Sequence, residues 1–266
     1  AQVFAAHGSS VTLIDVAQPA LERGRKAIQG SLARVVKKGG MTEADAEAAV
    51  GRIVTATELG AAQSADLVIE AASEDPAIKF RIFEQLDHVC APGTILATNT
   101  SSISITAIAA RTRRADNVVG MHFMNPVPVM QLVEIIRGQR TSDATTRNVM
   151  EWSRALGKTP VEVNDYPGFV ANRVLMPMIN EAVFCVMEGV ATAESVDTVM
   201  KLGMAHPMGP LALADLIGLD VCLAILEVLH AGLGDDKYRP CPLLRRMVAA
   251  GQLGRKSGQG FYEYTK

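Results

Sequence analysis

Val11-Thr12-Leu13-Ile14-Asp15 is an apolar run that closes on a carboxylate near the start of this 266-residue sequence. Short runs that contain β-branched residues and end on a turn-forming residue are typical of buried strands. Helical patterns, such as the one over 78–89, separate this run from three more, which cover 66–72, 94–99 and 118–123. Strands that alternate with helices, with few hairpin signals between them, predict a parallel α/β sheet over the first part of the chain.

Asp15 stands where the second strand of a dinucleotide-binding fold carries the acid that accepts hydrogen bonds from the adenosine ribose. No arginine follows it directly, over residues 16–18, which favours NAD over NADP. The loop G-x-G-x-x-G belongs about 20 residues before such an acid, and the sequence leaves no room for it. The opening residues 1–8 instead resemble the last turns of a helix that stops at Gly8. We therefore expect the first strand and the phosphate-binding loop to be missing, so that the chain is a fragment. The alternative is that Asp15 is a solvent-facing acid in a fold that binds no nucleotide.

The second part of the chain has a different hydrophobic pattern, one that is typical of helices. Asp165-Tyr166-Pro167-Gly168 supplies a turn, and apolar helical patterns then cover 169–187, 193–202 and 211–229. Pro177 is expected to kink the first of these helices. We expect an NAD-binding domain over 1–164 and an all-helical domain for substrate and dimer contacts over 165–266. The apolar helix faces are either ordinary core or part of a homodimer interface.

Composition limits the partners and the compartment. Hydrophobic residues make up 48% of the sequence, and the net charge of -2 is spread without a basic block, which argues against nucleic acid and anionic membranes. The longest apolar segment, over 210–219, is too short and too charged to cross a bilayer. The four cysteines form no C-x-x-C pair, so no metal site is expected; they are Cys90, Cys185, Cys222 and Cys241. A cytoplasmic location fits best, with the mitochondrial matrix as the alternative.

Gly120-Met121-His122-Phe123-Met124-Asn125-Pro126-Val127-Pro128 places a histidine at the end of an apolar run, and Glu134 lies inside the next one, over 132–136. Imidazole exchanges protons near neutral pH, and a carboxylate inside a buried run needs a partner. We therefore expect His122 to be a general base held by Glu134. The alternative is that His122 caps a strand while Glu134 faces water on an edge strand.

Five motifs in order make the sequence similar to the 3-hydroxyacyl-CoA dehydrogenase family, and within it to the single-function members that act on 3-hydroxybutyryl-CoA. They are Glu70-Ala71-Ala72-Ser73-Glu74, Thr98-Asn99-Thr100-Ser101-Ser102, His122-Phe123-Met124-Asn125-Pro126-Val127-Pro128, Pro167-Gly168-Phe169-Val170-Ala171-Asn172-Arg173 and Gly254-Arg255-Lys256-Ser257-Gly258-Gln259-Gly260-Phe261-Tyr262. The resemblance covers essentially the whole chain. It implies an incomplete Rossmann-type doubly wound parallel sheet followed by an all-helical domain. It also implies NAD-dependent oxidation of an L-3-hydroxyacyl-CoA to a 3-ketoacyl-CoA, and the reverse, in fatty-acid or butyrate metabolism.

The resemblance also implies roles for individual residues. His122 would take the hydroxyl proton, Glu134 would orient its ring, and Ser101 and Asn172 would bond the reacting oxygen or the thioester. The positions that would contact NAD are Asp15, Glu74, Lys79, Ser101, Asn125 and Lys256, and those that would meet coenzyme A are Ser31 and Lys38.

Each of these assignments has a simpler rival. Ser101 could cap the helix that starts near Ser104, and Asn172 could cap a helix or face solvent. Lys38 could belong to a solvated helix end that the helix dipole favours.

Two other functions remain open from the sequence. One is a 3-hydroxyisobutyrate-type β-hydroxyacid dehydrogenase, although such enzymes rely on a catalytic lysine where this chain has His122. The other is a non-catalytic protein on the same scaffold. Because the missing strand would be central in the sheet, we also expect the 266-residue chain to bind NAD weakly or not at all and to lose stability.

Overall fold

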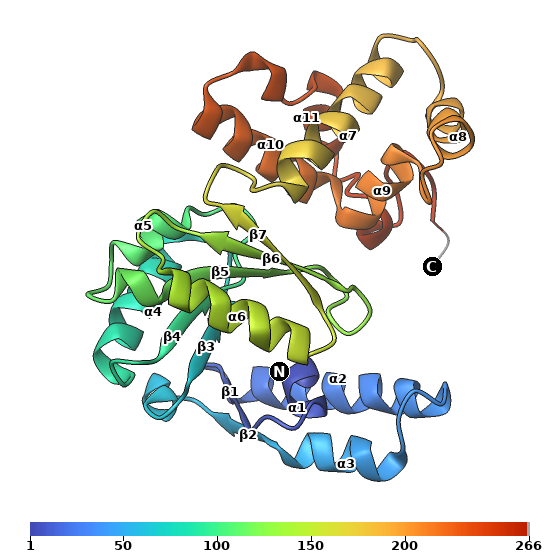
Figure 1. Cartoon of the computed structure of the whole chain (residues 1–266). Coiled ribbons are helices and arrows are strands. Elements are labelled where there is room, and N and C mark those ends of the chain that lie inside the picture. The colour runs from blue at the N-terminus through green and yellow to red at the C-terminus, as the bar shows by residue number, and fades with distance from the viewer. Residues whose placement is uncertain (265–266) are drawn as a thin grey trace. The chain divides into compact units, whose positions relative to one another are not determined.

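A computed structural model describes residues 1–264 of the chain. The chain divides into two compact units, Ala1–Asp165 and Tyr166–Lys266. The first unit carries all the named strands, and the second is built from helices (Figure 1). The predicted succession of an α/β part and a helical part is confirmed.

The first unit alternates helices with short strands. Its α-helices are α1 (Gln2–Ala6), α2 (Gln18–Lys37), α3 (Glu43–Gly51), α4 (Pro76–Val89), α5 (Ile105–Ala109) and α6 (Asp143–Ala155). Its strands are β1 (Val11–Ile14), β2 (Ile53–Ala56), β3 (Leu67–Glu70), β4 (Ile95–Thr98), β5 (Val118–Phe123), β6 (Leu132–Arg137) and β7 (Thr159–Asn164). The apolar runs recognised in the sequence therefore all become strands.

These strands form two sheets. β1 pairs with β2, and a five-stranded sheet has the order β3-β4-β5-β6-β7. Neighbours are parallel except β5 and β6, which run antiparallel. The expected parallel sheet therefore has one exception. The connection over 124–131 is too short for the crossover that parallel neighbours need, so β6 must run back along β5.

The edges of β1 and β3 have no strand partner beyond β2 and β4 within residues 1–264. Leu67, Val68 and Ile69 of β3 are only partly buried, whereas Leu96 and Ala97 of the neighbouring β4 are 0% exposed. A strand edge of this kind presents a row of backbone N–H and C=O groups that can pair with another strand.

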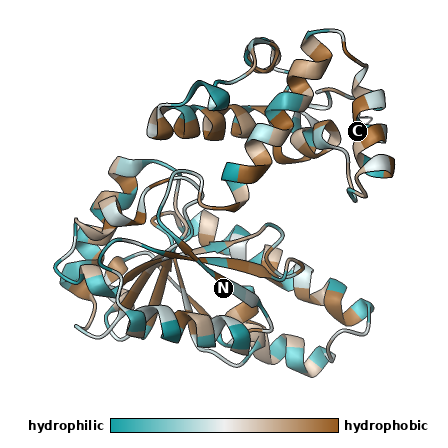
Figure 2. Cartoon of the chain, turned by 45° about the horizontal axis from the view of Figure 1, so that its top comes forward, coloured by the Kyte–Doolittle hydropathy of each residue, from teal (hydrophilic) through white to brown (hydrophobic). Residues whose placement is uncertain are grey.

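Helices cover both faces of the five-stranded sheet. Val149 of α6 packs on a row of alternate strand residues, namely Ile95, Ala97, Val119, Met121, Val133 and Ile135. Gly120 points to the opposite face, where a Cβ would lie 2.8 Å from Ile136 and 2.9 Å from Ile105 of α5. Glycine at this position is what lets α5 approach the sheet closely. Figure 2 shows the strands as largely hydrophobic, as expected for a sheet buried on both faces.

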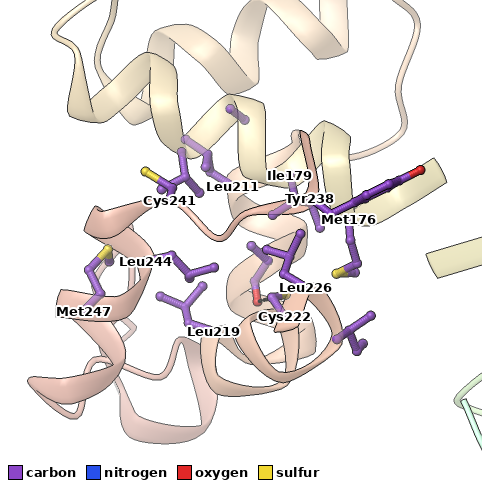
Figure 3. Close-up of a cluster of buried hydrophobic side chains, with 14 of the residues drawn as sticks. Met176, Ile179, Leu211, Leu219, Cys222, Leu226, Tyr238, Cys241, Leu244 and Met247 are labelled. Carbon is purple, nitrogen blue, oxygen red and sulfur yellow. Dashed lines mark hydrogen bonds between the residues drawn. The ribbon is translucent and has the colours of Figure 1, made fainter. Parts of the chain in front are cut away.

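The second unit contains α7 (Ala171–Met187), α8 (Ala193–Gly203), α9 (Pro210–Ile217), α10 (Leu219–Leu233) and α11 (Pro242–Ala249). The sequence predicted one helix over 211–229, and this was wrong. Gly218 has φ +107°, a conformation that L-residues avoid, so it ends α9 and starts α10. The core of the unit gathers side chains from α7, α9, α10 and α11 (Figure 3); those labelled include Met176, Ile179, Leu211, Leu219, Leu226 and Leu244.

No helix within residues 1–264 combines the length and the apolar character that crossing a bilayer would require.

Candidate active site

The register of β5 and β6 brings His122 and Glu134 together. They lie directly opposite each other in the antiparallel pair, so their side chains share one face of the sheet. His122 Nδ1 is 2.8 Å from Glu134 Oε2, and the two residues are 9% and 2% exposed. Glu134 lies on an interior strand, between β5 and β7. The alternative in which it faces water on an edge strand is therefore wrong.

The contact defines the chemistry of the histidine ring. A carboxylate accepts hydrogen bonds, so Nδ1 carries the proton that it donates to Glu134. In this tautomer the second ring nitrogen, Nε2, is the one that carries a lone pair and is the basic atom of the ring. The imidazolium that forms on proton uptake is stabilised by the buried carboxylate beside it. The arrangement can therefore act as a general base.

The segment after β4 is organised around Glu74. Its Oε1 accepts hydrogen bonds from the Thr100 hydroxyl at 2.6 Å and from the backbone N–H groups of Ser101 and Ser102 at 2.9 and 3.0 Å. The side chain that caps α5 is Ser104, which accepts from the Ala107 N–H at 3.2 Å. The rival interpretation of Ser101 as the helix cap is therefore wrong.

Lys79 sits behind this segment and is only 1% exposed. Its ammonium group donates to both carboxylate oxygens of Glu70, at 2.8 and 2.9 Å, and lies 3.4 Å from Glu74 Oε2. Burial acts to raise the pKa of Glu74, but the bonds from Thr100 and Ser101 and the Lys79 charge outweigh it. The net result is a pKa below the ordinary value.

Glu70 was not singled out in the sequence, although the signal was there. It is a carboxylate inside the apolar run 66–72, the same pattern that identified Glu134. In the structure it also accepts from the Thr98 hydroxyl at 2.7 Å and the Ala72 N–H at 2.6 Å. Its oxygens are thus engaged within the cluster.

Asn125 is exposed in the loop that follows β5, and its peptide bond to Pro126 is cis. The Lys158 ammonium group binds this loop by donating to the carbonyl groups of Val127 and Met130, at 2.5 and 2.7 Å. Burial lowers the pKa of Lys158. This lysine was missed in the sequence because its partners are backbone carbonyls, which leave no residue-type signal.

The carboxyl ends of the strands offer groups that fit a dinucleotide. Asp15 is exposed at the end of β1, where one of its oxygens accepts from the Ala17 N–H at 2.8 Å. Glu74, Ser101 and Asn125 follow β3, β4 and β5. Ligands of open α/β sheets bind outside the carboxyl ends of the strands, and carboxylate, hydroxyl and amide groups suit ribose and carboxamide partners. Among residues 1–264, no group of three or more His, Cys, Asp or Glu side chains could hold a metal ion.

Ser31 and Lys38 lie toward the C-terminal end of α2. Ser31 is partly buried, and Lys38 is the exposed C-cap residue of the helix. A groove of about 520 Å³ lies between α2 and α3, and it is lined by Gln29, Leu32, Ala33, Val36, Lys37, Glu43, Ala46, Glu47 and Val50. Neither Ser31 nor Lys38 is among the residues that line this groove.

Asn172 and Lys256 belong to the second unit. Asn172 lies in the first turn of α7 and is 8% exposed, so it neither caps the helix nor faces solvent. Lys256 lies in a short 3₁₀ turn, Arg255–Ser257, and donates to Asp220 Oδ2 at 2.7 Å. The ion pair lowers the pKa of Asp220 against the effect of burial, which acts to raise it.

Two further buried acids, also missed in the sequence, position residues 261–264. Asp215 accepts from the N–H groups of Phe261 and Tyr262 and from the Tyr264 hydroxyl, each at 3.0 Å. Asp197 accepts from the first N–H groups of α9 and from the Tyr262 hydroxyl at 2.8 Å. Burial raises the pKa of Asp215 despite these bonds.

Comparison with known proteins matches both units to one family. Residues 1–166 match the NAD binding domain of 3-hydroxyacyl-CoA dehydrogenase, and residues 168–264 match its C-terminal domain. A probable 3-hydroxybutyryl-CoA dehydrogenase of Bacillus subtilis (strain 168) is 59% identical over the whole chain and 93% of its own length. A 3-hydroxybutyryl-CoA dehydrogenase of Clostridioides difficile is 50% identical over 100% of this chain and 94% of its own. The crystal structure of (S)-3-hydroxybutyryl-CoA dehydrogenase PaaH1 from Ralstonia eutropha is 51% identical, with a TM-score of 0.97 over 100% of this chain and 94% of that one.

Proposed function

The chain belongs to the 3-hydroxyacyl-CoA dehydrogenase family of NAD-dependent oxidoreductases, and we propose that its substrate is 3-hydroxybutyryl-CoA. The proposed reaction is oxidation of the C3 hydroxyl to a ketone, and its reverse, in fatty-acid or butyrate metabolism. The observation that carries the proposal is the buried 2.8 Å contact between His122 and Glu134, together with relatives of that name at 50–59% identity.

The chemistry assigned to the chain is a proton transfer. His122 Nε2 takes the proton from the C3 hydroxyl during oxidation and returns it to the ketone oxygen during reduction. Glu134 fixes the ring through Nδ1 and balances the positive charge that develops on it. NAD, when bound, supplies the acceptor for the hydride that leaves C3. Ser101 and Asn172 are assigned to the reacting oxygen or the thioester, where a hydroxyl and an amide can donate.

The remaining positions divide between cofactor and substrate. Asp15 accepts from the adenosine ribose, and Glu74 and Lys79 supply the part of the NAD site that follows β3. Asn125 meets the nicotinamide side, and Lys256 is assigned a further cofactor contact. Ser31 and Lys38 are assigned to coenzyme A, for which an exposed lysine offers a cationic partner to phosphate.

The assembly is proposed to be a homodimer formed through the helical domain, in the cytoplasm. Apolar side chains of α8 and the residue that follows it support a subunit interface: Val199, Leu202 and Met204 are 60%, 81% and 60% exposed. Val199 and Leu202 stand three residues apart on one face of α8, and contiguous exposed apolar side chains are typical of surfaces that pack on another chain. We assign residues 1–164 to NAD and 165–266 to substrate and dimer contacts.

The substrate proposal is tested by comparing a thioester with free acids. The chain and a version preceded by a strand and a G-x-G-x-x-G loop are each mixed with NADH and acetoacetyl-CoA, and the loss of NADH absorbance is followed. We expect the extended version to consume NADH with the thioester and not with free acetoacetate. Turnover of free 3-hydroxyisobutyrate with NAD, and none of the thioester, would instead identify a β-hydroxyacid dehydrogenase.

A further inference from the structure

Lys158 directs its charge at neutral backbone groups. Within residues 1–264, its hydrogen-bond partners are the carbonyl groups of Val127 and Met130, at 2.5 and 2.7 Å. Burial of the ammonium lowers its pKa, so the charge is held at an energetic cost that a solvated lysine does not have. The two bonds therefore concern the loop over 124–131 rather than the neutralisation of an acid.

The backbone around Lys158 is fixed on both sides. Its N–H donates to the Ser153 carbonyl at 3.0 Å, where Gly157, with φ +69°, follows the end of α6. The N–H of the next residue, Thr159, donates to the Gln131 carbonyl at 2.8 Å at the start of β7. The side chain of Lys158 therefore reaches the loop from a backbone position that two elements determine.

The loop itself contains one short turn. The Pro126 carbonyl accepts from the N–H groups of Val129 and Met130, at 2.9 and 3.0 Å. Within residues 1–264, Lys158 is the one side chain from outside the loop that hydrogen-bonds to it. Hydrogen bonds from an ammonium are roughly twice as strong as those between neutral groups. The turn over 126–130 therefore depends on Lys158 for its attachment to the rest of the unit.

Asn125 immediately precedes this turn. It is three residues from His122, so the Cα atoms of the two residues lie within about 11 Å of each other. Its exposed side chain is the group assigned above to the nicotinamide side of NAD. The contact between His122 and Glu134 is set by the pairing of β5 with β6, whereas the position of Asn125 depends on the loop. A change in the loop should therefore affect cofactor placement and leave the base in position.

We propose that Lys158 is a positioning residue, which fixes the turn over 126–130 and thereby holds the Asn125 amide where it meets the nicotinamide. The inference rests on the proposed function, because Asn125 has this role only if NAD binds at the carboxyl ends of the strands. Lys158 acts through the backbone, so its effect requires a side chain that donates to both carbonyl groups.

Amide hydrogen exchange at Val129 and Met130 tests the effect on the turn without a ligand. Lys158→Met keeps the length of the side chain but has no donor, and Lys158→Arg keeps a cation with several donors. We expect the two amides to exchange about tenfold faster in Lys158→Met, because the turn loses two charge-assisted bonds. In Lys158→Arg their exchange should stay near the parent rate.

An internal control separates this effect from a general loss of stability. The Ile78 amide donates to Asp75 Oδ1 at 3.0 Å in the same unit, so its exchange should stay the same in both variants. Unchanged exchange at Val129 and Met130 in Lys158→Met would overturn the proposal. Equal acceleration at Ile78, or exchange in Lys158→Arg as fast as in Lys158→Met, would also overturn it.

Titration of the extended version with NADH tests the effect on Asn125. We expect Lys158→Met to weaken NADH binding by about tenfold. In an Asn125→Ala background the same substitution should change binding by less than about twofold, because both substitutions act on one contact. Lys26→Met, at an exposed lysine of α2, is the matched control and should bind as the parent does. Equal weakening in the two backgrounds would show that Lys158 does not act through Asn125, and would overturn the proposal.

Kinetics of the extended version separate positioning of the cofactor from damage to the base. In Lys158→Met, KM for NADH should rise by about tenfold while KM for the thioester changes by less than about twofold. The pH profile of kcat should keep its shape, since strand pairing holds His122 against Glu134. A displaced pH profile would mark a general disturbance of the sheet and would overturn the proposal. If the parent binds NADH but consumes none with any thioester, the proposed substrate is wrong, while the exchange and binding experiments still decide the role of Lys158.

A measurement on the unsubstituted chain covers the case in which Lys158→Met does not fold. The nitrogen-15 signals of the lysine ammonium groups are recorded for the 266-residue chain. Bonds to two carbonyl groups predict slow exchange of the Lys158 ammonium protons with water, and fast exchange at the exposed Lys26. Equal rates at the two lysines would show that the bonds to Val127 and Met130 do not persist, and would overturn the proposal.

Discussion

At the scale of single residues, the charges that matter are those placed inside apolar runs. Glu134 was found in the sequence because a carboxylate between Val133 and Ile135 needs a partner, and the structure gives it His122. Glu70 carried the same signal and was overlooked. The burial of Lys79 had no sequence signal, because its partners Glu70 and Glu74 are brought to it only by the packing of α4 beside β3.

Glu134→Gln tests how far the carboxylate assists the base. A carboxamide can still accept the bond from His122 Nδ1, but it cannot balance the charge on the imidazolium. We expect kcat for NADH oxidation with acetoacetyl-CoA to fall by about 10²-fold or more, with KM for the thioester changed much less. A variant with normal kcat would contradict the assigned role of Glu134.

Glu74 should titrate below the ordinary glutamate value of 4.5. A carboxyl whose pKa is lowered in the folded protein adds stability above that ordinary value, and loses it as pH falls through the lower folded value. The carbon-13 signal of the Glu74 carboxyl should therefore stay at its ionised position from pH 7 down to the ordinary value. A midpoint above 4.5 would show that burial outweighs the bonds from Thr100 and Ser101 and the charge of Lys79.

At the scale of elements, periodicity located most helices and strands but missed interruptions that depend on backbone geometry. The pattern over 211–229 was continuous, and only the positive φ of Gly218 divides it into α9 and α10. The direction of β6 followed from the length of the connection before it, a constraint that hydrophobic pattern alone does not express. The sequence did not predict that Asp197 and Asp215 would bind residues 261–264, because most of the donors that these two carboxylates bind are backbone N–H groups.

Asp215→Asn should weaken the hydrogen bonds that hold residues 261–264 and lower the free energy of unfolding. Both oxygens of Asp215 accept hydrogen bonds, and an amide nitrogen in place of Oδ2 would face the Tyr262 N–H and the Tyr264 hydroxyl. We expect unfolding by urea to show a loss of about 1–3 kcal/mol in stability. Asp236→Asn, at an exposed side chain of the same unit, is the matched control and should change stability by well under 1 kcal/mol. An equal loss of stability in the two variants would show that the hydrogen bonds of Asp215 to residues 261–264 do not stabilise the protein.

At the scale of the whole molecule, the strands of the first unit form two sheets, whose outermost members include β1 and β3. Each of these strands keeps one edge without a partner strand within residues 1–264, and the chain contains no G-x-G-x-x-G. The ribose acid Asp15 is in place at the end of β1, but the backbone N–H groups that cradle a pyrophosphate need such a loop at a helix N-terminus. The lack of this loop is the basis of the prediction that the 266-residue chain binds NAD weakly or not at all.

Calorimetric titration with NAD checks that prediction. We expect a version of the chain preceded by a strand and a G-x-G-x-x-G loop to bind NAD at least about tenfold more tightly than the 266-residue chain. It should also unfold at higher temperature, because an added strand has the edges of β1 and β3 to pair with. Tight NAD binding by the 266-residue chain alone would contradict the prediction.

The proton-accepting role of His122 is the claim on which the account depends. The rate of NADH consumption with acetoacetyl-CoA, measured for the extended enzyme and for its His122→Gln variant, tests it most directly. Gln keeps a side chain of similar length that can bond Glu134, but it has no nitrogen that takes up a proton at neutral pH. We predict that the variant folds, with the circular dichroism spectrum of the parent, and loses about 10²- to 10⁴-fold in kcat. A folded variant that turns over at the parent's rate would contradict the account.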